Sequence, residues 1–163
     1  MRRTAIIHHA DAMNNESADI LIVEDNPNDA ILVIRSLKHN NLANSIVHVS
    51  DGQTALDYLH AKDAFHERNP LNVPKVVLLD LKLPKLDGLQ VLSRIRADPR
   101  TKLVPVVILS SSQEESDLTE SYKLGANSYI VKPVEFEKLS RSIQEVGMYW
   151  LLLNTPPSRE INP

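Results

Sequence analysis

Five side chains that can bind a metal or handle a phosphoryl group directly follow short apolar runs: Glu24, Asp25, Asp80, Ser110 and Lys132. Three carboxylates packed together repel one another unless a cation lies among them. Oxygen ligands that leave positions for water suit Mg²⁺. An ammonium and a hydroxyl nearby would complete a pocket for a phosphoryl group. If the fold gathers these residues, they predict a Mg²⁺-dependent phosphoryl-transfer site.

The role of each residue follows from its chemistry. A carboxylate can attack phosphorus to give an acyl phosphate, so Asp80 is the predicted nucleophile. Asp25 and Asp80 would bind Mg²⁺ directly, and Glu24 would bind it directly or through water. Lys132 would neutralise charge on the transferred oxygens, and Ser110 would donate to one of them. Each residue also has an ordinary structural role open to it, but five such groups at strand ends are hard to obtain by chance.

The stretch Pro74–Gly88 organises the chain around the predicted nucleophile. Val76–Leu79 is a short apolar run of the kind buried on both faces of a sheet, and it ends in Asp80. Pro84 and the Asp87–Gly88 pair then turn the chain into a helical pattern. Open α/β sheets bind their ligands at the carboxyl ends of such strands.

The same strand-then-helix pattern occurs five times. The expected strands are Asp19–Val23, Ser45–Val49, Val76–Leu79, Val104–Leu109 and Ser128–Val131. The last helix is expected at Glu135–Leu153, with Asn26 capping the first helix and Ser112 with Glu115 forming a capping box. Strands that alternate with helices predict an α/β fold with a parallel sheet covered on both faces. We therefore expect a doubly wound, flavodoxin-like three-layer sandwich with strand order 2-1-3-4-5.

Composition narrows the function classes. The chain has 163 residues, 42% of them hydrophobic, a net charge of −3 and no cysteine. These values predict one globular domain without disulfides or thiol catalysis, in a cytoplasmic setting, and disfavour nucleic-acid binding. No apolar run is long enough for a membrane span. Met1–Ala18 is interpreted as a mobile extension, residues 19–153 as the domain and Asn154–Pro163 as a tail.

Between Asp19 and Trp150 the sequence resembles a response-regulator receiver domain of two-component signalling. The family pattern is an acidic pair, an Asp in a DxxMPxxDG-like run, a Ser or Thr, and Lys-Pro. Here these elements read Glu24-Asp25, Asp80–Gly88, Ser110 and Lys132-Pro133, with Leu83 where the family often has Met. The resemblance implies phosphorylation of Asp80 by a partner histidine kinase. It also implies a cis peptide bond before Pro133.

Further roles are implied by the resemblance alone. The backbone carbonyl of Lys82 would be a third protein ligand of Mg²⁺. Ser110 and the strand-five aromatic Tyr129 would form a switch that reshapes the surface of helix four, strand five and helix five. The side chains of Lys82 and Ser112 would flank the approach of water, and so set the lifetime of the aspartyl phosphate.

A narrower resemblance concerns the partners. The long Ala61–Pro74 connection and the extended last helix resemble stand-alone receivers that serve phytochrome-type bacterial histidine kinases, and the connection is a candidate kinase contact. Too few residues follow Trp150 for an output domain, so output by association is expected. The apolar residues Met148, Tyr149 and Leu151–Leu153 suggest a homodimer interface, unless this end folds back on its own domain.

Two other function classes remain open. The chain could be a pseudo-receiver, a binding module that never takes phosphate. It could also be a Mg²⁺-dependent phosphatase with an Asp nucleophile. That class requires a second acid two residues after the nucleophile, a position that Lys82 occupies here. On the receiver interpretation the chain is no enzyme beyond its own phosphoryl acceptance and slow autodephosphorylation.

Overall fold

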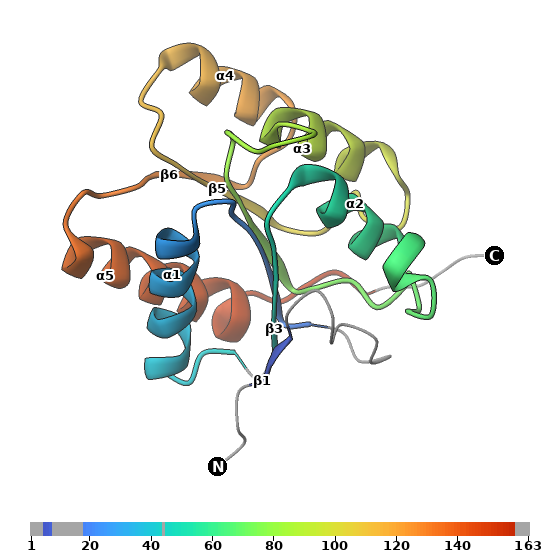
Figure 1. Ribbon diagram of the computed structural model, residues 1–163, viewed down its shortest axis with the longest axis horizontal. Coiled ribbons are helices and arrows are strands. Elements are labelled where there is room, and N and C mark those ends of the chain that lie inside the picture. Colours follow the sequence, from blue (N-terminus) through green and yellow to red (C-terminus); the bar gives the residue numbers. More distant parts are fainter. Residues whose placement is uncertain (1–4, 8–17, 44, 159–163) are drawn as a thin grey trace.

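The computed structural model describes residues 5–7, 18–43 and 45–158. They form one six-stranded parallel sheet with the order β1-β3-β2-β4-β5-β6 (Figure 1). The strands are β1 (Ala5–Ile7), β2 (Ile20–Val23), β3 (Ser45–Val49), β4 (Val76–Leu79), β5 (Val106–Ser110) and β6 (Ser128–Val131). The five strands expected from the sequence are β2 to β6, and their predicted order is confirmed.

The sixth strand was not expected. Ala5–Ile7 pairs in parallel with Ser45–Val47 at the edge of the sheet. The interpretation of Met1–Ala18 as a mobile extension is therefore wrong for these three residues. Residues 1–4 and 8–17 lie outside the described part of the chain. Three apolar residues are too short a run to show a strand period.

Helices cover both faces of the sheet. They are α1 (Pro27–His39), α2 (Gly52–His60), α3 (Gly88–Ala97), α4 (Glu115–Lys123) and α5 (Phe136–Gly147), with the short segments η1 (Asp63–Phe65) and η2 (Met148–Leu153). Helices α1 and α5 lie side by side on one face, and α2 and α3 lie on the other (Figure 1). In the described residues, no helix combines the length and the apolar character that crossing a membrane requires.

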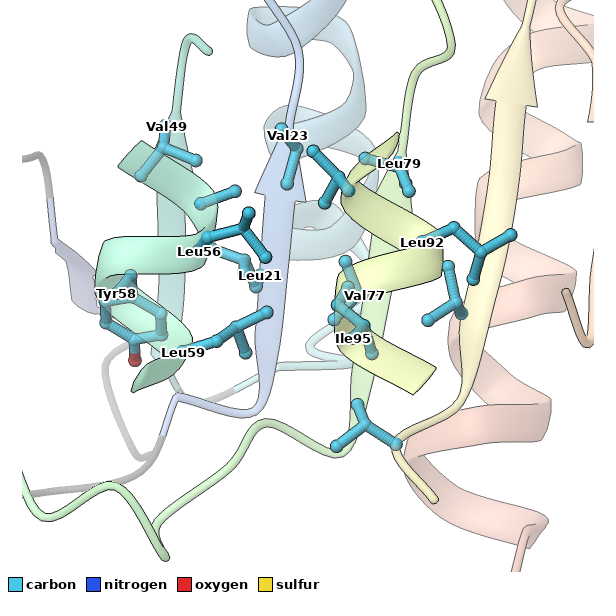
Figure 2. Packing of buried hydrophobic residues seen from close by; sticks show 14 of the residues in the cluster. Leu21, Val23, Val49, Leu56, Tyr58, Leu59, Val77, Leu79, Leu92 and Ile95 are labelled. Carbon is cyan, nitrogen blue, oxygen red and sulfur yellow. The ribbon is translucent and has the colours of Figure 1, made fainter. Parts of the chain in front are cut away.

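The side chains of β2 alternate between two apolar cores. Leu21 and Val23 face α2 and α3, whereas Ile20 and Ile22 face α1 and α5. Figure 2 shows the first core, in which α2 and α3 bring residues such as Leu56 and Leu92 onto the sheet. A central strand buried on both faces is held firmly, so its carboxyl end is a fixed platform for the residues that follow.

The cap of α1 agrees with the prediction, but the cap of α4 does not. The Asn26 side chain accepts hydrogen bonds from the backbone N–H groups of Asn28 and Asp29. The predicted capping box of Ser112 and Glu115 is wrong, because α4 begins one residue after Glu114 without a side-chain cap. The Ser112 side chain instead accepts from the Glu114 N–H at 3.3 Å.

The predicted long last helix is divided in two. Helix α5 ends at Gly147, and the π-helical segment η2 continues to Leu153. At Gly147 an added Cβ would lie 2.9 Å from Leu42 Cδ1, so α5 approaches the end of α1 closely here. Leu151 packs into the core of α1 and α5, while Leu152 and Leu153 are exposed.

The long connection from α2 to β4 is anchored by Arg68. This side chain is buried, and its guanidinium donates to the backbone carbonyls of Tyr58 and Asn72. It also lies 3.7 Å from the centre of the Tyr58 ring. The two carbonyls and the aromatic face compensate for burial of the Arg68 charge. These contacts hold the connection in one conformation.

Candidate functional site

Strand register places the carboxyl ends of β2, β4, β5 and β6 at one edge of the sheet. Val23 lies opposite Leu79, and the Asp80 N–H donates to the Val23 carbonyl at 3.1 Å. On the other side, the Lys132 N–H donates to the Ser110 carbonyl at 2.8 Å. The residues that follow these strands therefore meet at this edge, as the sequence predicted.

Three carboxylates form a compact cluster there. Oxygens of Glu24, Asp25 and Asp80 all lie within 4.8 Å of one another. Glu24 and Asp80 are 3% and 8% exposed, whereas Asp25 is exposed. Two buried carboxylates and one that is open to water form a donor set that fits a hard cation such as Mg²⁺, with positions left for water and a further oxygen ligand.

The Lys132 ammonium contacts two carboxylates of this cluster. Its Nζ lies 2.5 Å from Glu24 Oε2 and 3.1 Å from Asp80 Oδ2. It also lies 3.1 Å from Asp29 Oδ2. Burial alone would lower the pKa of Lys132, but the hydrogen bond to Glu24 and the charge of Asp80 outweigh burial and raise it. The ammonium is thus fixed as a cation beside the predicted nucleophile.

Glu24 is the most buried acid of the cluster. Burial raises its pKa to about 7, and the charge of Asp80 acts in the same direction. The hydrogen bonds from Lys132 and from the Asn26 N–H, at 3.0 Å, limit the increase. Both carboxylate oxygens of Glu24 therefore already have partners within the chain.

Asp29 is the contact that sequence reasoning missed. It lies in the first turn of α1, where an acid is favourable at any helix N-terminus. Its reach to Lys132 depends on how α1 is rotated over the sheet. The signal in the sequence is its place in the first helical turn after the capping residue Asn26.

Ser110 and Ser112 lie on the loop that leads from β5 to α4. Ser110 is 1% exposed, and its Oγ accepts from the Ser112 N–H at 3.2 Å. The Ser112 hydroxyl donates to Asp117 Oδ2 at 2.5 Å. The Tyr129 hydroxyl donates to the Ser112 carbonyl at 3.0 Å. One loop thus connects Ser110 with the aromatic of β6 and with the first turn of α4.

The loop after β4 surrounds Asp80. The Lys82 N–H points to Asp80 Oδ1 at 3.4 Å, and the Lys82 side chain is exposed. Gly88 packs against the same backbone, because a Cβ added there would lie 2.2 Å from the Asp80 carbonyl oxygen. The metal-ligand role of the Lys82 carbonyl remains a prediction.

One expectation from the family resemblance is wrong. The peptide bond before Pro133 is trans, and no cis peptide bond occurs among the described residues. Lys132 reaches the cluster without it. Strand pairing of Ser110 with Val131 fixes the end of β6, and the long Lys132 side chain spans the remaining distance.

Comparisons with known proteins identify a family and similar relatives. The profile of the response regulator receiver domain matches residues 20–144. The probable methanogenesis regulatory protein FilR2 of Methanothrix harundinacea (strain 6Ac) is 42% identical over 138 residues, which cover 85% of this chain and 86% of FilR2. Response regulator Rcp1 of Synechocystis sp. (strain ATCC 27184 / PCC 6803 / Kazusa) is 35% identical over 145 residues, covering 89% of this chain and 97% of Rcp1.

Solved structures give the same result. The crystal structure of the Mn²⁺-bound form of response regulator Rcp1 has a TM-score of 0.79, is 34% identical and covers 85% of this chain and 98% of Rcp1. The phosphorylated cyanobacterial phytochrome response regulator RcpA has a TM-score of 0.81 and is 37% identical. That match covers 87% of this chain and 99% of RcpA.

Proposed function

Because this chain belongs to the response regulator receiver family, we propose that it accepts a phosphoryl group on Asp80 from a partner histidine kinase, in a Mg²⁺-dependent reaction. One observation carries the proposal. Asp80 lies within a carboxylate cluster and 3.1 Å from the Lys132 ammonium, so a nucleophile, a metal-binding set and a fixed cation meet at one point.

The transfer is a displacement at phosphorus. A carboxylate oxygen of Asp80 forms a P–O bond while the bond from phosphorus to the donor's histidine nitrogen breaks, and that nitrogen keeps the electron pair. Lys132 neutralises charge on the transferred oxygens. Ser110 donates a hydrogen bond to one of them when its hydroxyl, which accepts from the Ser112 N–H, turns toward the phosphoryl group. Hydrolysis of the acyl phosphate by water returns Asp80, which is the only turnover we assign to the chain.

Asp25 and Asp80 would hold Mg²⁺ directly, with the Lys82 carbonyl as a third protein ligand. Glu24 would act through water, since its two oxygens are engaged by Asn26 and Lys132. When bound, the metal supplies positive charge that offsets the charge of the phosphoryl oxygens and the carboxylates. The similarity to Rcp1, which is known in a Mn²⁺-bound form, supports binding of a divalent cation by this chain.

Signalling would use the loop between β5 and α4. When Ser110 turns to a phosphoryl oxygen, the Ser112 carbonyl moves with it, and the Tyr129 hydroxyl follows. The same loop carries the bond to Asp117 in α4. Phosphorylation would therefore bias the surface of α4, β6 and α5 between two arrangements.

The kinase is proposed to be of the phytochrome type, and the setting to be cytoplasmic. Likeness to RcpA, a cyanobacterial phytochrome response regulator, supports this assignment. The α2–β4 connection, held in place by Arg68, is the proposed kinase contact.

Output would proceed by protein association, with a homodimer as the first candidate. Met148, Tyr149, Leu152 and Leu153 expose apolar surface at the end of the chain's last helix. Exposed apolar residues that gather on one segment favour a protein interface. Analytical ultracentrifugation of the phosphorylated and unphosphorylated protein would test this, with Leu152→Ser/Leu153→Ser expected to remain monomeric.

The phosphoryl transfer is tested with Mg²⁺ and acetyl phosphate, read out by intact mass. We expect a gain of one phosphoryl group that EDTA prevents and that Asp80→Asn lacks. Consumption of the donor with no gain in mass would favour the phosphatase alternative. An unconsumed donor and an unchanged mass would favour a pseudo-receiver.

A further inference from the structure

The Lys132 ammonium has three N–H donors, and all three have a carboxylate partner. Glu24, Asp29 and Asp80 each lie within 3.1 Å of Nζ. Two of these three acids, Glu24 and Asp80, belong to the candidate metal-ligand set. Asp29 is the exception, so it can stay with the ammonium when Asp80 binds a cation.

Asp29 is held at this position by a closed ring of hydrogen bonds. Glu24 Oε1 accepts from the Asn26 N–H at 3.0 Å, and Asn26 Oδ1 accepts from the Asp29 N–H at 3.2 Å. Asp29 Oδ2 then binds Lys132 Nζ, which returns to Glu24 Oε2. The helix cap thus fixes the first turn of α1 relative to both the acidic pair and the lysine.

The burial of the partners makes this contact more than a surface ion pair. The Lys132 and Asp29 side chains are 8% and 30% exposed, and the two residues come from elements 103 positions apart in the chain. A buried ammonium needs its partners, since an unpaired buried charge is costly. Loss of Asp29 would therefore be compensated by stronger pairing of Lys132 with Glu24 and Asp80.

We propose that Asp29 is a positioning residue for Lys132. It shares the ammonium with Glu24 and Asp80, so that Lys132 pairs less tightly with their oxygens, and competes less with a divalent cation, than it would without Asp29. It also leaves the third N–H of the ammonium directed at Asp80. This proposal rests on the proposed function, because it concerns the same Mg²⁺ site.

The experiment is a double-mutant cycle on the Mg²⁺ dissociation constant, measured by calorimetry on the full chain. Asp29→Asn keeps the shape of the side chain and removes its charge. We expect it to raise the Kd by about fivefold in the wild-type background. In a Lys132→Gln background no ammonium competes for the ligands, and the same change should raise the Kd by less than about twofold.

The matched control is Glu137→Gln, which removes an acid from the first turn of α5. It should leave the Kd unchanged in both backgrounds. If Asp29→Asn raises the Kd by the same factor in both backgrounds, the Asp29 charge acts on the cation directly and not through Lys132. That result overturns the proposal. An unchanged Kd in the wild-type background also overturns it. Failure of the proposed function is distinguishable, because it appears as wild-type protein that takes no phosphoryl group.

Discussion

The hydroxyl of Tyr129 donates to the backbone carbonyl of Ser112 at 3.0 Å, which ties the β6 aromatic to the loop after Ser110. The Ser112 side chain in turn donates to Asp117 in the first turn of α4. Ser112 therefore stands between the phosphoryl pocket and the proposed output surface. Because its hydroxyl already donates to Asp117 of α4, Ser112 is better placed to transmit movement to α4 than to position a water molecule.

Tyr129→Phe removes this hydrogen bond and keeps the ring. We expect a loss of about 1 kcal/mol in the free energy of unfolding, since the Ser112 carbonyl loses its partner. Phosphoryl uptake at Asp80 should be unchanged, but the difference in hydrogen exchange of α4 between the phosphorylated and free forms should shrink. Tyr122→Phe, on the exposed face of α4, is the control and should alter neither quantity. An unaltered exchange difference in Tyr129→Phe would remove Tyr129 from the switch.

Lys82→Ala should shorten the lifetime of the aspartyl phosphate. The Lys82 side chain is exposed two residues after Asp80, where its bulk and charge would obstruct an incoming water. We expect the hydrolysis rate to rise by about threefold, which corresponds to a small change in barrier. The decay is followed by intact mass after removal of the donor. Lys85→Ala, which loses a lysine that pairs with Asp51, is the matched control. Equal decay in wild type and Lys82→Ala would contradict this role.

The stability of the metal-free protein should depend on pH through Glu24. Its pKa is raised by burial to about 7 in the folded protein, against an ordinary value of 4.5. The folded state therefore binds a proton first as the pH falls. The stabilisation from this group is complete below pH 4.5 and is lost as the pH rises through 7. Between pH 8 and pH 6, wild type should gain about 1 kcal/mol relative to Glu24→Gln.

Urea unfolding in EDTA at several pH values measures that difference. Glu24→Gln is the reference because it cannot titrate, while the histidines of the chain contribute equally to both proteins. Parallel pH profiles for the two proteins would show that Glu24 does not take up a proton in this range.

The fold and most of the site could be predicted because their signals are local. Short apolar runs such as Val76–Leu79 predict buried strands. In a parallel sheet, the residue after each strand lies at the carboxyl edge of the sheet. This reasoning placed Glu24, Asp80 and Lys132 together although Glu24 and Lys132 are 108 positions apart. A cap residue such as Asn26 bonds to backbone groups within one helical turn, so its role could also be predicted from the sequence.

The missed features depend on how elements pack. Asp29 reaches Lys132 only because of the rotation of α1 over the sheet, which the helical period does not determine. Ser112 prefers Asp117 to its predicted cap partner because α4 begins after Glu114. The pairing of Ala5–Ile7 with β3 is a long-range contact of three residues. Tertiary contacts determine these pairings, and a local sequence pattern carries little information on tertiary contacts.

Gly88→Ala tests how tightly the site depends on its backbone. The added Cβ would lie 2.2 Å from the Asp80 carbonyl oxygen and 2.7 Å from Leu81 Cα, and neither backbone atom can turn away as a side chain can. We expect a loss of about 2 kcal/mol in stability and slower phosphoryl uptake, because the loop that carries Asp80 must shift. The control is Gly147→Ala, where the nearest atom is the flexible end of Leu42, in the core that α1 and α5 form with the sheet. Gly147→Ala should also lose stability, yet take up phosphoryl groups at the wild-type rate. If both variants slow uptake equally, the effect is one of general stability and the close packing of Gly88 has no special part in the chemistry.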